Sequence, residues 1–313
     1  MPAIKDGMLI TGGAGFIGRA LIQIALDSGC RVAVYDNLSF GRRSNLASFG
    51  DTVTFFEEDI RNRDAFSRAC QAFNPERVIH LAALHFIPYC DAHPEETLEV
   101  NVAGTYAVLH TCERLGIEKV VFASTGALYA SAAHPLNESQ DQPSPGDIYG
   151  LSKLLGENIC AYFNANTGLN CSVARFFNAY GPYETNPHLI PHMLQSLKQG
   201  PQIELGNLHT KRDYIFVEDL ANILFRYSTV DVPQNAVMNI GTGLEYSARE
   251  IVDHLSDLLG ISIEVLSDSK RIRPVDKQHQ IADTSRMMEW TGCAPGHGIL
   301  NGLRKLLVHE QIL

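Results

Sequence analysis

Short runs of apolar residues alternate with longer amphipathic stretches through the first half of the chain. The runs predict strands at 8–11, 31–35, 53–57, 77–81, 119–123 and 170–175, and the stretches between them predict helices at about 16–28, 62–73, 94–115 and 147–166. Several strand-like runs lack polar alternation, which is typical of parallel strands covered by helices on both faces. The pattern therefore predicts an α/β fold with a doubly wound parallel sheet.

The pattern changes near residue 178, where a Gly-Pro pair marks a turn and the elements become shorter. Helices are predicted at about 188–199, 218–229, 247–259 and 297–309, and strands at 202–205, 213–217, 236–240, 263–265 and 279–282. We expect a first domain over residues 1–178 and a smaller α/β substrate lobe over residues 179–313, with some segments returning to the first domain. The sequence contains no repeats and no flexible linker, so the two parts should pack against each other.

Composition narrows the class of protein. The 313 residues have a formal net charge of −10, which disfavours binding to nucleic acid or to an anionic membrane. No apolar run approaches the ~18 residues of a membrane span, and no secretory leader is recognisable, so we expect a soluble cytoplasmic protein. The seven cysteines are scattered without a Cys-x-x-Cys pair, which predicts reduced thiols, no disulfide framework and no metal site.

A glycine-rich loop follows the first predicted strand directly. Its sequence, Gly12-Gly13-Ala14-Gly15-Phe16-Ile17-Gly18, matches Gly-x-Gly-x-x-Gly and opens the first predicted helix. Glycines there permit a tight turn and a close approach to a pyrophosphate, and the helix N-terminus offers amide donors to the phosphates. The loop predicts a dinucleotide-binding Rossmann domain.

The acidic residue at the end of the second strand predicts which dinucleotide binds. Asp36 stands about 20 residues after the loop, where a carboxylate accepts hydrogen bonds from the ribose diol and repels a 2′-phosphate. Arg42 and Arg43 could reach a 2′-phosphate, but a solvated surface pair is the better reading while Asp36 is present. NAD is therefore the predicted cofactor.

A tyrosine and a lysine lie one helical turn apart in the fourth predicted helix. Tyr149 and Lys153 share a face at this spacing, and a cation beside a phenol favours the phenolate, which can act as a base. The pair follows a strand that ends in Ser124-Thr125. Together with the dinucleotide loop, these residues predict redox chemistry on a hydroxyl group.

Ordered motifs of this kind run along nearly the whole chain. In addition to the loop and the Tyr149/Lys153 pair, they are Asp36-Asn37-Leu38, Asp59-Ile60, Leu81-Ala82-Ala83, the segment from Asn101 to Thr105, the segment from Arg175 to Pro182, the segment from Arg212 to Leu220, and the segment from Arg273 to Asp276. On these motifs the chain resembles the extended short-chain dehydrogenase/reductase family, and within it the NAD-dependent nucleotide-sugar epimerases and dehydratases.

The resemblance implies a role for each matching position. Tyr149 would be the acid/base, Lys153 would bind the nicotinamide ribose and lower the tyrosine pKa, and Thr125 would hydrogen-bond the reacting sugar hydroxyl. It places further cofactor contacts at Gly12, Gly15, Phe16, Ile17, Gly18, Asp36, Asn37, Asp59, Ile60, Leu81, Ala82, Ala83 and Asn101. Substrate contacts are implied at His85, Ser124, Asn178, Arg212, Arg273 and Asp276. Asp276 would orient Arg273 or touch the nucleoside ribose.

Arginines suit the proposed diphosphate because their planar donors match phosphate oxygens. His85 follows the fourth strand, where it would contact the sugar or simply pack in the loop. The long helices at 94–115 and 147–166 imply a homodimer by resemblance. We expect a nucleoside-diphosphate sugar as substrate, with a UDP-sugar first.

The residues after Thr125 distinguish between the reactions of this family. Dehydratases and decarboxylases of the family place acidic side chains there, whereas this chain has Gly126 and Ala127, which cannot move protons. We therefore expect a 4-epimerase that inverts C4 through a transient 4-keto sugar. A dehydratase or decarboxylase using His85 or Cys90, a 4-keto-sugar reductase, and a non-catalytic dinucleotide sensor are the alternatives.

Overall fold

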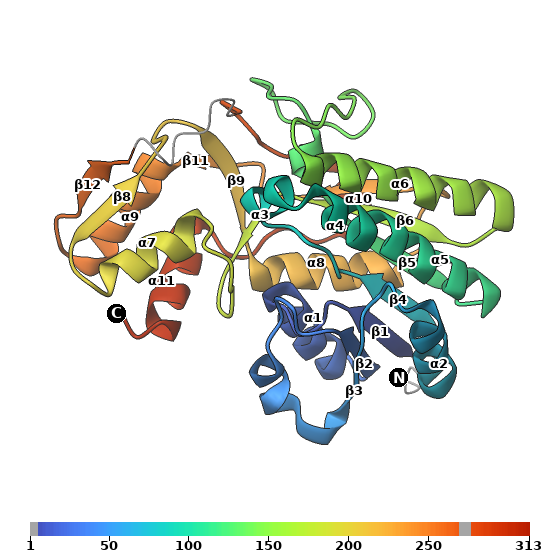
Figure 1. Cartoon of the computed structure of the whole chain (residues 1–313). Helices are drawn as coiled ribbons and strands as arrows, with labels where there is room; N and C mark the ends of the chain where they lie inside the picture. Colours follow the sequence, from blue (N-terminus) through green and yellow to red (C-terminus); the bar gives the residue numbers. More distant parts are fainter. Residues whose placement is uncertain (1–5, 269–276) are drawn as a thin grey trace.

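The larger part of the molecule is built on one seven-stranded parallel sheet (Figure 1). The computed structural model describes residues 6–268 and 277–313. The strand order is β3 (Val53–Glu57), β2 (Arg31–Asp36), β1 (Gly7–Thr11), β4 (Arg77–His80), β5 (Lys119–Thr125), β6 (Cys171–Phe176) and β10 (Val237–Ile240). Every pairing in the sheet is parallel, which confirms the predicted fold class.

Helices cover both faces of this sheet, as the strands without polar alternation predict. One face packs against α1 (Phe16–Asp27), α8 (Val217–Thr229) and α10 (Ser285–Thr291). The other face packs against α2 (Arg63–Phe73), α5 (Thr105–Arg114) and α6 (Ile148–Thr167). All seven residues of β5 are buried, so the strand that ends at Thr125 lies in the centre of the domain.

The helix predicted over 94–115 is interrupted. It consists of α4 (Pro94–Leu98), a π-helical turn over Glu99–Gly104, and α5, and a short helix α3 (Ile87–Ala92) precedes it. Such π turns interrupt the normal hydrogen-bond ladder and occur often at functional sites. Asn101 lies in this turn.

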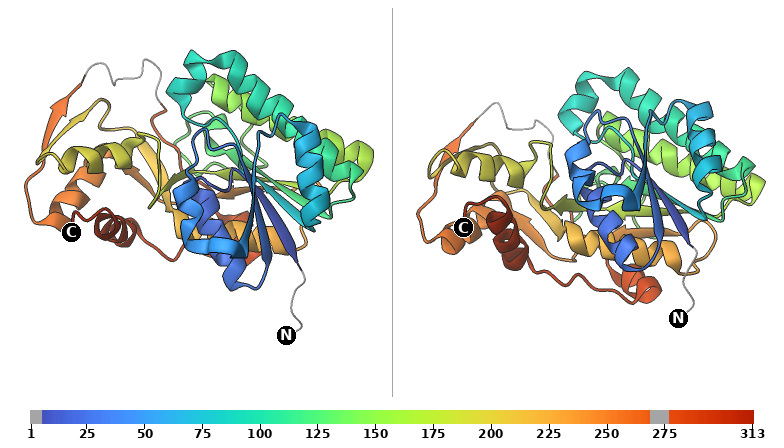
Figure 2. Two further views of the ribbon diagram at one scale, coloured as in Figure 1. Left: turned by 60° about the horizontal axis from the view of Figure 1, so that its bottom comes forward. Right: turned by 90° about the horizontal axis from the view of Figure 1, so that it is seen from below.

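A smaller lobe lies beside the carboxyl ends of the large sheet (Figure 2). It contains a three-stranded sheet of β7 (Asn178–Tyr180), β9 (Lys211–Phe216) and β11 (Glu245–Ser247), and a parallel pair of β8 (Gln202–Leu205) and β12 (Glu264–Ser267). Its helices are α7 (Leu189–Leu197), α9 (Ala248–Leu259) and α11 (Ile299–His309). They share one core with side chains such as Met193, Ile251 and Leu303, all of them fully buried.

Local sequence explains where α9 begins and ends. The Ser247 hydroxyl accepts a hydrogen bond from the Glu250 N–H, and the Glu250 carboxylate accepts one from the Ser247 N–H, which forms a capping box. Gly260 ends the helix in the left-handed conformation with φ of 66°.

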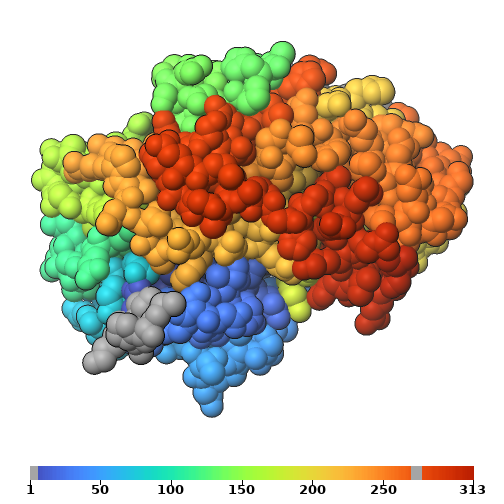
Figure 3. Space-filling model, turned by 180° about the vertical axis from the view of Figure 1, so that it is seen from behind, coloured from blue at the N-terminus to red at the C-terminus, as the bar shows by residue number. Residues whose placement is uncertain are grey.

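The two parts are not divided at a single point in the chain. β10 completes the large sheet beside β6, although it follows β9 of the smaller lobe, and α8 packs against α1. Residues beyond 277 cross the back of the molecule from the large sheet to the smaller lobe (Figure 3). The strand predicted at 279–282 is wrong. Only Ala282 forms an isolated bridge, to Leu136, because this segment lies along β9 without completing a ladder.

Among the helices of residues 6–268 and 277–313, none combines the length and apolar character needed to cross a bilayer. The same ranges contain no group of three or more His, Cys, Asp or Glu side chains that could hold a metal ion. All seven cysteines are free thiols, and only Cys293 is not fully buried.

Candidate active site

A groove of about 310 Å³ lies at the carboxyl ends of β1, β2 and β4. Ligands of open α/β sheets bind in this position. Ten residues that the sequence assigned to the cofactor line the groove: Gly12, Gly15, Phe16, Asp36, Asn37, Asp59, Ile60, Leu81, Ala82 and Ala83. Ile17 instead packs against the core under α1.

The glycine loop is shaped for close approach. Gly12 has φ of +71°, and a Cβ on it would lie 2.7 Å from the backbone nitrogen of Ala82. A Cβ on Gly18 would lie 2.5 Å from the Cα of Gly13, so Gly18 permits α1 to pack on the loop. The N-terminus of α1 at Gly15 has no side-chain cap and no acidic residue in its first turn. Its amide donors therefore suit a pyrophosphate.

The Asp36 carboxylate is held in place by two backbone amides. The Ala14 N–H donates to Oδ2 at 3.0 Å and the Leu38 N–H donates to Oδ1 at 2.8 Å. Burial raises the pKa of Asp36, and these two hydrogen bonds oppose the rise by favouring the ionised form. Arg43, which could reach a 2′-phosphate by its place in the sequence, instead forms an ion pair with Glu57 at 2.8 Å. A fixed carboxylate at this place fits a ribose diol and disfavours a 2′-phosphate.

The neighbouring wall of the groove is polar. The Asn37 amide donates to Asp59 Oδ2 at 2.9 Å, and Arg61 forms an ion pair with the same carboxylate at 2.8 Å. The hydrogen bond from Arg61 is the largest cause of the lowered pKa of Asp59. Arg61 itself lines the groove. Sequence reasoning missed it, although it stands two residues after the Asp59 that was assigned to this wall.

Tyr149 and Lys153 lie on the face of α6 that covers the end of β5. Asp147 caps α6 by accepting from the Gly150 N–H at 2.7 Å, so Tyr149 stands in the first turn. Thr125 hydrogen-bonds the Tyr149 phenol, and its hydroxyl oxygen also accepts from the Ala127 N–H at 3.0 Å. The predicted acid/base and the predicted hydroxyl partner are therefore in contact.

The environment of the pair shifts both pKa values. Burial raises the pKa of Tyr149, and the hydrogen bond from Thr125 opposes that rise. Burial lowers the pKa of Lys153 from 10.5 to about 8. The Lys153 ammonium donates to the Ala123 carbonyl at 2.8 Å and lies 4.9 Å from the centre of the Phe122 ring. Both shifts have one cause, because burial disfavours whichever form is charged.

His85 lines the groove and is held as a neutral imidazole. Its Nε2 lies 2.8 Å from the Asn186 amide nitrogen, which can only donate, so Nε2 accepts. Burial lowers the pKa of His85 to about 4, and His188 and Lys153 lower it further by smaller amounts. A hydrogen bond between the ring and the Ala83 backbone opposes this shift. Asn186 and Thr185 also line the groove, and no sequence motif identified them.

Asn101, predicted as a cofactor contact, and Ser124, predicted as a substrate contact, form hydrogen bonds within the protein. The Asn101 side chain accepts from the Leu84 N–H at 2.8 Å and donates to the Leu84 carbonyl at 2.8 Å and to Ser152 Oγ at 2.9 Å. It therefore fixes the loop that follows β4. The Ser124 hydroxyl donates to Glu157 Oε1 at 2.5 Å and is buried, with 2% of its surface exposed.

The residues assigned to the diphosphate lie partly in the smaller lobe. Asn178 pairs with Tyr214 between β7 and β9, and Arg212 lies two residues before Tyr214 on the same face. Asn178 and Arg212 are thus diagonal neighbours across the two strands. Arg212 donates to the carbonyls of Lys211 at 2.8 Å and Lys277 at 2.7 Å. Arg273 and Asp276 lie outside the described residues.

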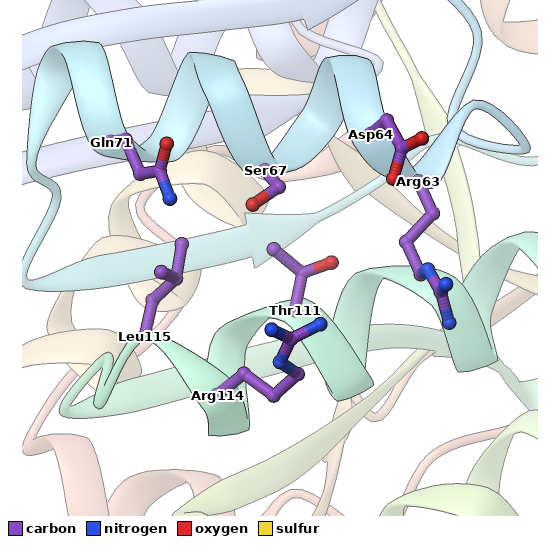
Figure 4. A pocket seen from close by; sticks show the side chains of 7 residues that line it. All are labelled: Arg63, Asp64, Ser67, Gln71, Thr111, Arg114 and Leu115. Carbon is purple, nitrogen blue, oxygen red and sulfur yellow. The ribbon is translucent and has the colours of Figure 1, made fainter.

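A second hollow, of about 80 Å³, lies between α2 and α5 (Figure 4). Arg63, Ser67, Thr111 and Arg114 are among the side chains that line it. It shares no lining residue with the groove. The glycine loop and Tyr149 lie elsewhere, so this hollow is separate from the candidate active site.

Comparison with known proteins identifies the family. Residues 8–241 match the family model described as the NAD dependent epimerase/dehydratase family. The chain belongs to this family. The fit of the groove to a dinucleotide agrees with membership, and NAD is the cofactor.

Relatives of the chain are named for more than one reaction. A UDP-glucose 4-epimerase from Azospirillum brasilense is 31% identical over 99% of this chain and 94% of its own length. The crystal structure of a Thermus thermophilus UDP-glucose 4-epimerase in complex with NAD superposes with a TM-score of 0.88, at 30% identity, over 97% of this chain and 99% of that one. A dTDP-glucose 4,6-dehydratase from Streptomyces venezuelae, with NAD and TYD bound, superposes with a TM-score of 0.89 at 26% identity, over 97% of each chain.

Proposed function

We propose that the protein is an NAD-dependent nucleoside-diphosphate-sugar 4-epimerase. The observation behind this proposal is the contact between Thr125 and Tyr149 beside a loop that lacks an acid. Gly126 begins a short 3₁₀ turn, Gly126–Leu128, and a Cβ on it would lie 3.1 Å from the Phe177 ring. A side chain at residue 126 would therefore require Phe177 to shift by a few tenths of an ångström, and neither Gly126 nor Ala127 can move a proton.

The chain's own residues account for the proton transfers of an epimerase. Tyr149 removes the proton from the sugar C4 hydroxyl and later returns a proton to the same oxygen, while Thr125 orients that hydroxyl. Lys153, one helical turn from Tyr149, would supply a positive charge that favours the ionised form of the phenol. NAD, when bound, supplies the hydride acceptor and donor. Inversion requires only that the 4-keto sugar present its other face before the hydride returns.

The two residues named as proton donors for the alternative lyase reactions, His85 and Cys90, are poorly suited to that role. A dehydratase or decarboxylase needs a further acid, and His85 is held neutral with its pKa lowered to about 4. Cys90 is 0% exposed and burial raises its pKa. A 4-keto-sugar reductase would use the same residues and would differ by consuming reduced cofactor. These features favour the epimerase over the lyase.

We further propose a UDP-sugar as substrate, with Asn178, Arg212 and Arg273 on its diphosphate and Asp276 beside them. Residues 1–178 would bind NAD and residues 179–313 would bind the nucleotide sugar. The protein would act in the cytoplasm as a homodimer. Exposed apolar side chains on α5 and α6, namely Tyr106, Leu151 and Tyr162, support pairing through these two helices.

The proposal is tested by incubating the purified protein with UDP-, GDP-, dTDP- and CDP-sugars and separating the products. We expect a C4 epimer of unchanged mass and no net consumption of added NADH. Exclusive loss of water or carbon dioxide would identify a lyase, and steady oxidation of NADH would identify a reductase. Tyr149→Phe should abolish turnover while NAD still binds, and full activity in this variant would refute the assignment of Tyr149.

A further inference from the structure

Three residues of α6, spaced four apart, contact three consecutive residues at the end of β5. Tyr149 is bonded to Thr125, Lys153 donates to the Ala123 carbonyl, and Glu157 accepts from Ser124. The spacing places the three α6 side chains on one face of the helix. These contacts fix how far α6 lies along β5, and so where the Tyr149 phenol stands relative to Thr125.

Glu157 is the third contact, and it is buried in an ion pair. Its side chain is 8% exposed and that of its partner Arg175, on β6, is 6% exposed. Arg175 Nε donates to Oε1 at 2.9 Å and Nη2 donates to Oε2 at 2.6 Å, so the pair is bidentate. With the Ser124 hydroxyl on Oε1, both carboxylate oxygens have donors. A buried pair tolerates the loss of water only when it is bonded in this way.

The same arginine extends the network across the sheet. Arg175 Nη1 donates to the Tyr129 hydroxyl at 2.5 Å, and Tyr129 donates to Asn239 Oδ1 on β10 at 3.0 Å. The Asn239 amide donates to the Leu136 carbonyl at 2.8 Å. The network therefore joins α6 to β6, to β10 and to the segment after Thr125. None of its side chains lines the groove.

We propose that Glu157 and Arg175 are positioning residues that hold Tyr149 and Lys153 in register on β5, and that Ser124 acts in this network and not as a substrate contact. The inference rests on the proposed function, since it assumes that Tyr149 is the acid/base. It assigns Ser124 differently from the sequence motif, which grouped it with Thr125 because the two are adjacent. Here Thr125 is bonded to Tyr149 and Ser124 to Glu157, which stands eight residues after Tyr149 on the same face of α6.

The first test compares Ser124→Ala with Ser124→Thr. Ser124→Ala removes the hydroxyl that donates to Glu157, and we expect kcat to fall about 10-fold with KM for the nucleotide sugar unchanged. Ser124→Thr keeps a hydroxyl and should recover most of the loss. A rise in KM with kcat unchanged would show that Ser124 contacts substrate and would overturn the proposal. Unchanged kcat and KM in Ser124→Ala would overturn it as well.

The second test uses Glu157→Gln, which keeps the shape and removes the charge. We expect kcat to fall at least 10-fold while NAD affinity stays within about 2-fold. The titratable groups that interact with Lys153 are Cys90, Cys160, Glu157, His80 and His85, and Glu157 favours its protonated form. The alkaline limb of the pH–kcat profile should therefore move to lower pH in Glu157→Gln. A profile and kcat equal to those of the wild type would refute the positioning role.

Asp6→Asn is the matched control. Asp6 forms a buried ion pair with Arg77 at the opposite end of the sheet, and its side chain is 7% exposed. This variant should lose stability without any change in the pH–kcat profile. A shifted profile in Asp6→Asn would show that the shift reports general destabilisation, and would refute the inference. Failure of the proposed function is distinguishable, since it would appear in the products of the wild-type protein, as loss of water or carbon dioxide or as steady oxidation of NADH, whatever Glu157→Gln does.

Discussion

Replacement of Lys153 by methionine gives the sharpest test of the electrostatics of the site. Lys153 is 3% exposed, and burial lowers its pKa from 10.5 to about 8. Between these two pH values the unfolded chain binds a proton that the folded chain has released, so Lys153 makes stability rise with pH. At ~1.4 kcal/mol for each pH unit, the gap corresponds to ~3 kcal/mol. Lys153→Met removes this contribution.

The measurement is the free energy of unfolding by urea at pH 7.5 and at pH 10.5. The wild-type value minus the Lys153→Met value should increase by ~3 kcal/mol over this interval, since contributions from other titrating groups cancel in the difference. In the same variant kcat should fall at least ~100-fold, as expected for a group that supports acid–base catalysis. A difference that stays flat with pH would refute the reasoning from burial.

Lys119 provides a matched control for this experiment. It is also buried, its pKa is also lowered to about 8 by burial, and its ammonium donates to the carbonyls of Tyr227 and Val230 at the end of α8. Lys119→Met should show a comparable dependence of the stability difference on pH. Its kcat should stay near the wild-type value, because Lys119 stands at the opposite end of β5 from Thr125.

Three further variants test other parts of the structure. Gly12→Ala should weaken NAD binding at least ~10-fold by titration, because its Cβ would lie 2.7 Å from Ala82 N at a φ that disfavours side chains; unchanged affinity would contradict the close approach. Asp36→Ala should lower the preference for NAD over NADP by ~10-fold or more, as measured by the two dissociation constants, through loss of charged hydrogen bonds. Asp213→Ala should cost ~3 kcal/mol or more in a urea melt, since the buried carboxylate accepts from the amides of Thr242, Gly243 and Ala282; a cost near zero would refute that role.

Most of the large sheet was predictable because its strands are continuous apolar runs between helical patterns. The strand at Val53–Glu57 was placed at its observed bounds. The short strands β7 and β11 were missed, since three residues give no periodicity, and they form only because β9 lies between them. The strand predicted at 279–282 was wrong. The segment has hydrogen-bonding neighbours on both sides, β9 and Leu136, but these bonds form only an isolated bridge and no ladder.

The site was predictable where a motif is local. The glycine loop, Asp36 and the Tyr149/Lys153 pair are each read from a short stretch, and the groove contains ten of the residues assigned to NAD. Asn186 was not predictable, because it reaches His85 from 101 residues away in sequence. The bonding of Ser124 was also hidden, since its partner Glu157 stands 33 residues later and the pairing depends on how α6 docks.

The place of β10 in the large sheet has a consequence for the synthesis of the protein. A ribosome releases the chain from its N-terminus, so β1 to β6 emerge before α8 and β10 exist. Until residues 217–240 have left the ribosome, the outer edge of β6 and the apolar face of α1 that packs on α8 remain open to other chains. Open strand edges and apolar faces promote aggregation. Nascent chains that stall before residue 217 should therefore be the forms that depend most on chaperones.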